Sequence, residues 1–280
     1  LVDARLDVGE AVAIVARVGR RLVERARDVG DDRLGAFARQ PQQVARVAAQ
    51  IGLLDRSEEL RIEAIRLARQ HFELAAQFGV GAGASRLITG DGPLNEQLET
   101  RLAAKKGLEA CRVFGSGYLA NIGTIPALVG KGDTIVMDAL SHACMHAGAR
   151  LSGAEIRIFR HNDLAHAEAL MGDAPGQLLV LTETVFSMDG DLAPLADLGA
   201  LCERHDAWLV VDEAHAAGVV GPDGLGSTAE HASHPRLAAR TITGGKAFGA
   251  AGALVVGPSE LVELVANRAR SFVFTTAPPP

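Results

Sequence analysis

Two acids and a histidine follow an uncharged run in the segment AWLVVDEAHAAGVVG, residues 207–221: Asp212, Glu213 and His215. A short apolar run of this kind is typical of a buried strand. In a parallel sheet, ligands bind at the carboxyl ends of the strands, which is where these side chains would lie. An acid at that place could hold a metal ion or a protonated nitrogen, and a histidine could donate a hydrogen bond or move a proton.

The letters Asp-Glu-Ala-His also spell a helicase box, in which the acids hold Mg²⁺ against nucleotide phosphates. That chemistry requires a phosphate-binding loop of the form G-x-x-x-x-G-K-[ST]. The two lysines that follow a glycine, Lys131 and Lys246, are themselves followed by Gly132 and Ala247. Because no such loop is present, nucleotide hydrolysis is disfavoured.

Lys246 is the only charged residue of TITGGKAFGAAGALVVG, residues 241–257. Desolvation among these small and apolar residues would lower the pKa of the amine, which makes a lysine nucleophilic towards an aldehyde. The flanking glycines would let the backbone approach a bound ring closely. The alternative is an ordinary solvated lysine, and local composition leaves both interpretations open.

A possible seat for an anion lies in RVFGSGYLANIGTIPALVG, residues 112–130. Its turn, Gly115-Ser116-Gly117, leads into a helix whose first N–H groups are unpaired and whose dipole favours an anion. Alone, this segment is more typical of an ordinary glycine turn with a serine cap. Together, an acid, a lone lysine and an anion seat are what pyridoxal phosphate (PLP) needs for its ring nitrogen, its aldehyde and its phosphate.

Composition limits the other function classes. The chain has 280 residues, 48% of them hydrophobic, and a net charge of −6, which favours a globular protein and disfavours nucleic acid as a partner. Its three cysteines form no CxxC pair, as is typical of a reducing compartment. No apolar run reaches the roughly 18 residues of a membrane helix. We therefore expect a cytoplasmic protein that binds neither nucleic acid nor membrane.

Apolar periodicity divides the chain into two parts. From about residue 8 to 76, apolar residues recur every three or four positions, which predicts amphipathic helices. Further on, buried strands are predicted at 133–138, 154–160, 176–183 and 207–213, and helices at 146–152, 163–171 and 194–205. This alternation predicts an α/β fold with a mainly parallel sheet flanked by helices. We expect a helical N-terminal extension at 1–76 and a cofactor-binding large domain at 77–280.

Nearly the whole of this second part resembles the α-oxoamine synthases, fold-type I PLP enzymes that condense an amino acid with an acyl thioester. The matching stretches are GVGAGASRLITGDGPLNEQLE (79–99), GSGYLAN (115–121), DALSHACMHAGARLSGAEIRIFRHND (138–163), TETVFSMDGDLAPL (182–195), VDEAHAAGVVGPDGLG (211–226), TGGKAFG (243–249) and RSFVFTTAPPP (270–280). The resemblance implies the fold-type I large domain of the PLP-dependent transferases and PLP as the cofactor. Since the smaller C-terminal domain of the family has no counterpart, we expect a piece of a longer protein.

The resemblance assigns catalytic roles by position. Lys246 would bond to the cofactor aldehyde and later move the α-proton of the substrate. Asp212 would pair with the pyridine nitrogen, and because it keeps that nitrogen protonated it would sustain the ring as an electron sink. His215 would hydrogen-bond the ring oxygen, and His142 would stack on the ring.

Four further residues are implied as cofactor contacts. Gly117 and Tyr118 would offer backbone N–H groups, Thr243 would bind the phosphate, and Ser187 would line the site.

Within the family, the motifs are most similar to the branch that makes 8-amino-7-oxononanoate for biotin synthesis. This implies L-alanine and a pimeloyl thioester, carried on coenzyme A or on a carrier protein, as substrates of a decarboxylative acyl transfer, and a homodimer as the assembly. The alternatives are a related synthase that uses glycine or serine with another acyl-CoA, and a non-catalytic remnant of the cofactor fold.

A metal centre is not predicted. His142 and His146 are one helical turn apart, but the segment between them lacks the glutamate of the zincin motif. Glu213, next to Asp212, is expected to orient its neighbours rather than to react.

Overall fold

The computed structural model describes residues 66, 70 and 73–279. The chain divides into two compact units, Leu1–Ala76 and Gln77–Pro280. The described residues of the first unit, 66, 70 and 73–76, are helical; the remainder of the predicted helical extension lies outside the described residues. Among the residues described, no helix is both long and apolar enough to cross a bilayer.

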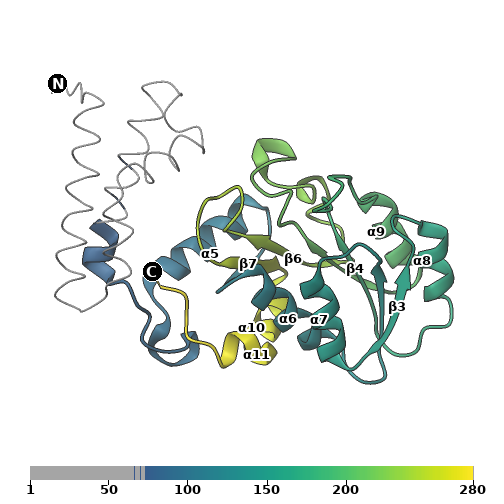
Figure 1. Ribbon diagram of the computed structural model, residues 1–280, viewed down its shortest axis with the longest axis horizontal. Helices are drawn as coiled ribbons and strands as arrows, with labels where there is room; N and C mark the ends of the chain where they lie inside the picture. Colours follow the sequence, from purple (N-terminus) through teal and green to yellow (C-terminus); the bar gives the residue numbers. More distant parts are fainter. Residues whose placement is uncertain (1–65, 67–69, 71–72, 280) are drawn as a thin grey trace, which may run out of the picture. The chain divides into compact units, whose positions relative to one another are not determined.

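The second unit is built on one seven-stranded sheet in the order β1-β7-β6-β5-β4-β2-β3 (Figure 1). Its strands are β1 (Ala110–Phe114), β2 (Thr134–Asp138), β3 (Glu155–Phe159), β4 (Leu178–Glu183), β5 (Trp208–Asp212), β6 (Leu237–Thr243) and β7 (Ala253–Gly257). β7 pairs antiparallel with β1 and β6, whereas β3, β2, β4, β5 and β6 pair in parallel. The predicted mainly parallel sheet is confirmed.

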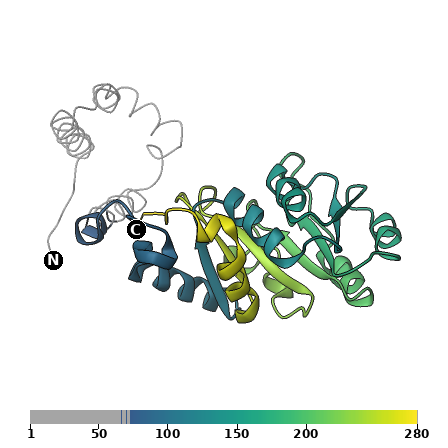
Figure 2. The ribbon, with the colours of Figure 1, turned by 90° about the horizontal axis from the view of Figure 1, so that it is seen from below.

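Helices cover both faces of this sheet (Figure 2). Those of eight residues or more are α5 (Pro93–Lys105), α6 (Gly117–Leu128), α7 (Ala143–Ser152), α8 (Leu164–Met171), α9 (Leu195–Arg204) and α10 (Ser259–Arg268), and shorter ones are α11 (Arg270–Val273), η1 (Arg86–Gly90), η2 (Pro222–Gly224) and η3 (Ala229–His231). Along β4, Leu179 and Leu181 pack in one apolar cluster with α6, α7 and α10. Leu178 and Val180 pack in another with α8 and α9. Since side chains alternate along a strand, these clusters lie on opposite faces.

One predicted strand differs from expectation in its burial. β2 and β4 are buried throughout and β5 nearly so, as a central strand between two helix layers should be. β3 is not buried on both faces, because it is the edge strand and pairs only with β2; Ile158 is 49% exposed.

Three strands were not predicted from the sequence: β1, β6 and β7. In β6 the buried Arg240 interrupts the apolar run. Its guanidinium donates to the backbone oxygens of Leu237 and Ala232 at 3.1 and 2.9 Å. Burial lowers the pKa of Arg240 to about 10. Local backbone acceptors thus let a cation occupy a central strand, which a periodicity argument does not foresee.

The parallel strands bring four polar residues to one edge of the sheet. Asp138, Glu183, Asp212 and Thr243 are the last residues of β2, β4, β5 and β6. Because these strands run in the same direction, their carboxyl ends meet at this edge. The fold therefore gathers three acids and a hydroxyl where a ligand would bind.

Candidate active site at the carboxyl edge of the sheet

The Asp212 carboxyl is held by two N–H donors. Its Oδ2 accepts from Asn121 Nδ2 at 2.6 Å, and its Oδ1 accepts from the Ala214 backbone N–H at 2.8 Å. Asn121, on α6, is fully buried and in turn accepts from Thr241 Oγ1 at 2.8 Å. Burial raises the pKa of Asp212 above its ordinary value, although these donors and the nearby Lys246 act in the opposite direction. Asp212 is a fixed acceptor able to hold one more proton donor or a cation.

Lys246 and His215 lie side by side at this edge. Lys246 Nζ is 2.7 Å from His215 Nε2 and 3.3 Å from Nδ1. Burial lowers the pKa of His215, and the positive charge of Lys246 lowers it further. Both effects favour the uncharged form of the His215 imidazole.

Of the two interpretations left open for Lys246, the structure favours the solvated one: the turn of residues 245–251, which carries it, is exposed. The turn connects the antiparallel strands β6 and β7, and such connections run over the surface because their backbone groups need water. The small, uncharged residues around Lys246 belong to an exposed turn and do not bury the lysine.

The predicted helix start after Gly115-Ser116-Gly117 is confirmed. Ser116 caps α6, with its side chain accepting from the Leu119 N–H at 3.2 Å. The N–H groups of Gly117 and Tyr118 belong to the first turn, which has no helical acceptor for them. A Cβ placed on Gly117 would lie 2.6 Å from Thr243 Oγ1. The start of α6 thus adjoins the end of β6, where N–H groups without a helical acceptor and a hydroxyl can bind an anion.

His142 is fixed at the start of α7. Its Nδ1 accepts from the Cys144 N–H at 3.2 Å and lies 2.8 Å from Cys144 Sγ. Asn121 Nδ2 also contacts that sulfur at 3.1 Å. His142 is therefore linked through Cys144 to the residue that holds Asp212.

Two predicted contacts are less closely placed. Ser187 is exposed, in the tight turn closed by the Gly190 N–H donating to the Phe186 carbonyl oxygen at 2.9 Å. Within the described residues, no hydrogen bond joins Ser187 to the other predicted site residues. The side chain of Tyr118 is 49% exposed, so its backbone N–H rather than its ring would serve the site.

Two polar residues at this edge, Glu183 and Asn121, were not predicted from the sequence. Glu183 is 1% exposed, and its Oε2 lies 3.6 Å from His215 Nδ1. Burial raises the pKa of Glu183 to about 7, and the charge of Asp212 acts in the same direction. The signal that could have found it is its place at the end of the predicted strand 176–183. Asn121 offered a weaker signal, a polar residue within an apolar helix.

Glu213, next to Asp212 in the sequence, binds a partner outside this group of residues. It forms a buried ion pair with Lys106, which also donates to the backbone oxygen of Leu225. The Thr228 N–H donates to Glu213 Oε1 at 2.9 Å. Glu213 therefore ties β5 to α5 and to the loop at 225–228, and it does not face Lys246.

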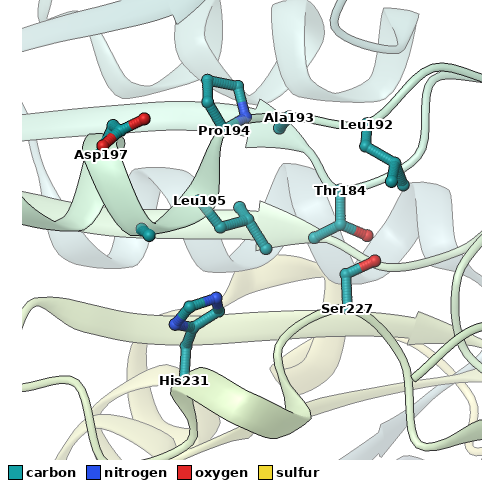
Figure 3. A pocket seen from close by; sticks show the side chains of 9 residues that line it. Thr184, Leu192, Ala193, Pro194, Leu195, Asp197, Ser227 and His231 are labelled. Atoms are coloured by element: carbon teal, nitrogen blue, oxygen red, sulfur yellow. The ribbon is translucent and has the colours of Figure 1, made fainter.

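A shallow pocket of about 270 Å³ lies elsewhere, at the start of α9 (Figure 3). Figure 3 shows Thr184, Leu195, Ser227 and His231 around it, with the Ser227 hydroxyl pointing towards Thr184. None of the predicted site residues lines this pocket. The shape of this pocket therefore does not single out the predicted site residues.

Metal-binding clusters of three or more His, Cys, Asp or Glu are absent from the part of the chain that the structure describes. What the edge does hold is an amine and an imidazole in contact, a buried acceptor for a protonated nitrogen, and a helix start beside a hydroxyl. These groups can bind an aromatic aldehyde that carries a ring nitrogen and an anionic arm.

Comparison with known proteins identifies relatives of this second unit. The family of aminotransferases class I and II matches over residues 52–280. The 8-amino-7-oxononanoate synthase of Maricaulis maris is 53% identical over 211 residues, 74% of this chain and 53% of its own length. That of Beijerinckia indica is 50% identical over 206 residues, 72% and 53% of the two chains. This chain thus spans about half the length of the curated relatives it matches.

Solved structures give the same grouping. A serine palmitoyltransferase from S. paucimobilis, bound to PLP and myriocin, is 35% identical with a TM-score of 0.71, over 74% of this chain and 54% of that one. The 8-amino-7-oxononanoate synthase of Francisella tularensis is 29% identical with a TM-score of 0.64, over 75% and 58%. The resemblance to α-oxoamine synthases that the motifs indicated is confirmed, and the chain belongs to the aminotransferase class I and II family.

Proposed function

We propose that this chain is the PLP-binding domain, at residues 77–280, of an enzyme that condenses L-alanine with a pimeloyl thioester to give 8-amino-7-oxononanoate for biotin synthesis. The observation that carries the proposal is the contact of Lys246 with His215 at the sheet edge that also carries Asp212. It occurs in a chain 53% identical to an 8-amino-7-oxononanoate synthase.

The residues present fit PLP. Asp212 offers a buried acceptor to a protonated ring nitrogen, and Lys246 offers an amine to an aldehyde. The close approach of Gly117 to Thr243, where a Cβ would meet the hydroxyl, makes a seat for phosphate at the start of α6. His142, held by Cys144, would stack on the ring.

Bound PLP supplies an electron sink for the electrons released at the α-carbon of an amino acid. The chain's own groups do the rest. Asp212 holds a proton on the ring nitrogen, His215 donates a hydrogen bond to the ring oxygen, and Lys246 removes and returns the α-proton. The backbone N–H groups of Gly117 and Tyr118 would bind the phosphate, and Ser187 would line the site.

We further propose a cytoplasmic homodimer. Exposed apolar side chains stand next to the predicted site residues: Tyr118 itself, Leu140 near His142, Met188 beside Ser187, and Phe248 near Lys246. Exposed apolar side chains favour association, and a second copy would cover them.

A second candidate is a synthase with a different substrate pair, such as serine with a long-chain acyl-CoA. It is favoured by the higher TM-score of serine palmitoyltransferase, 0.71 against 0.64. The test supplies purified protein and PLP with alanine, glycine or serine, each against pimeloyl-, acetyl- and palmitoyl-CoA, and identifies products by mass. Only alanine with the pimeloyl thioester should give a product with loss of CO₂. Preference for serine and palmitoyl-CoA would favour the second candidate, and PLP binding without any product would favour a non-catalytic remnant.

A further inference from the structure

Glu183 and Asp212 form a pair of neighbouring buried acids. They are opposite each other in the register of β4 and β5, and each is the last residue of its strand. Glu183 is 1% exposed and Asp212 5% exposed. Adjacent strands lie about 4.8 Å apart. Two carboxylates at such a spacing, away from water, repel each other strongly, so that the pair retains a proton.

The hydrogen bonds decide which of the two carries the charge. Both oxygens of Asp212 accept from N–H donors, Asn121 and Ala214. In contrast, the buried Glu183 Oε1 has no hydrogen-bond partner. The His142 backbone N–H is a donor to the Glu183 carboxyl, whereas Glu183 Oε2 lies 3.6 Å from His215 Nδ1, which is longer than a hydrogen bond. Donors stabilise an ionised carboxylate, so the geometry favours the negative charge on Asp212 and the proton on Glu183.

We propose that Glu183 is a positioning residue that carries a proton beside Asp212, keeps Asp212 as the single anion of the pair, and supports the His215 ring. The role in catalysis rests on the proposed function, since it makes Asp212 available to a protonated ring nitrogen. The protonation itself is a property of the chain without any cofactor.

Charged and titratable groups face Glu183 from every element packed around the strand end. They are Asp138 at the end of β2, His142 before α7, Cys144 on α7, Asp212 at the end of β5, His215 just beyond it, and Lys246 in the β6–β7 turn. Burial, Asp212 and Asp138 raise the pKa of Glu183, while the His142 backbone N–H and Lys246 lower it, and the result is about 7 against an ordinary 4.5. The two acids raise the pKa of Glu183 more than the Lys246 amine lowers it, because Lys246 is exposed to solvent.

The first test uses the cofactor-free protein. When folding raises the pKa of an acid, the protein has the full stability associated with that acid at pH values below the unfolded pKa. This stability is lost as the pH rises through the folded pKa. Between about pH 5 and pH 8, the unfolding equilibrium constant of the wild-type protein should rise by an extra factor of the order of 100 relative to Glu183→Gln. Denaturant unfolding at both pH values measures it.

The matched control is Asp189→Asn, which makes the same carboxylate-to-amide change six residues away, at an exposed position. It should keep the wild-type pH dependence. A Glu183→Gln protein with the wild-type pH dependence would overturn the proposal. If that variant does not fold, wild-type protein with ¹³C-labelled glutamate serves instead. One glutamate carboxyl resonance should titrate near pH 7. The absence of any such resonance would also overturn the proposal.

The second test adds PLP and follows its visible absorbance. Glutamine mimics a protonated glutamate, so Glu183→Gln should keep the band and lose the wild-type change in the band between about pH 6 and pH 8. Glu183→Met, which offers His215 no oxygen, should bind PLP about 10-fold more weakly than Glu183→Gln; equal affinities would remove the positioning role. Failure of the wild-type protein to bind PLP would refute the proposed function while leaving the cofactor-free test valid.

Discussion

Asn121 Nδ2 lies 2.6 Å from Asp212 Oδ2, and this contact joins the middle of α6 to the end of β5. The same amide group reaches Cys144 Sγ, and the amide oxygen accepts from Thr241. One fully buried side chain thus links two strands and two helices around the acid that is proposed to bind the ring nitrogen. Asp212 is thus oriented by Asn121 at one carboxyl oxygen and by the Ala214 N–H, within the Asp-Glu-Ala-His segment, at the other.

Replacing Asn121 should therefore weaken both the fold and the site. Asn121→Ala leaves Asp212 Oδ2 and Thr241 Oγ1 without their partner, so the free energy of unfolding should fall by about 1–3 kcal/mol. PLP affinity should fall by about 10-fold because the acid is no longer held. Denaturant unfolding and a PLP titration measure the two effects. Asn267→Ala, at an exposed position on α10, should change stability by less than about 0.5 kcal/mol; an equal loss in both variants would contradict the assigned role.

Lys246→Ala should abolish the covalent attachment of PLP. Lys246 is the amine in contact with His215 at the sheet edge, and a lysine amine is what bonds to an aldehyde. After borohydride reduction of the wild-type protein with PLP, peptide mass spectrometry should find the adduct on the peptide that contains Lys246. The exposed Lys131 serves as the control, since Lys131→Ala should retain the adduct. An adduct that persists in Lys246→Ala would assign the aldehyde to another amine.

The positions of Asp212 and His215 at the end of a strand could be predicted from the sequence, because an apolar run followed by polar residues indicates both a strand and its end. It could not place Glu183 against Asp212, since the register of β4 and β5 depends on pairing between distant segments. Nor could local composition show that Lys246 is exposed, because small residues are typical of turns as well as of cores. The motifs that resemble a known family supplied the residue roles, which the physical pattern alone left open.

Lys106→Met should destabilise the protein strongly. Lys106 is 5% exposed and pairs with the fully buried Glu213. Removing the cation leaves a buried carboxylate without its counter-charge, a loss that amounts to about 3–5 kcal/mol. The neighbouring Lys105 is exposed, so Lys105→Met should change the free energy of unfolding by less than about 0.5 kcal/mol. The double variant Lys106→Met/Glu213→Leu should recover part of the loss, and no recovery would mean that the ion pair is not its cause.

His161 should make the stability of the fold depend on pH. Its Nδ1 lies 3.0 Å from Asp138 Oδ1, and its Nε2 lies 2.7 Å from Asp191 Oδ2. Burial lowers the pKa of His161, but the hydrogen bonds and charges of the two acids outweigh burial, so that the pKa is raised. A histidine with a raised folded pKa contributes stability that is complete below its unfolded pKa of about 6.5 and is lost as the pH rises through the folded value.

The His161→Gln variant should therefore lose more stability at about pH 6 than at about pH 9, relative to the wild-type protein. Denaturant unfolding at the two pH values gives the difference directly. His231→Gln is a suitable control, because among the described residues the two acids pair with His161 and not with the His231 side chain; it should lack the difference expected for His161→Gln. A loss in His161→Gln that does not change with pH would show that the ring acts by packing against Phe186, which it meets edge-on at 4.4 Å, rather than by its charge.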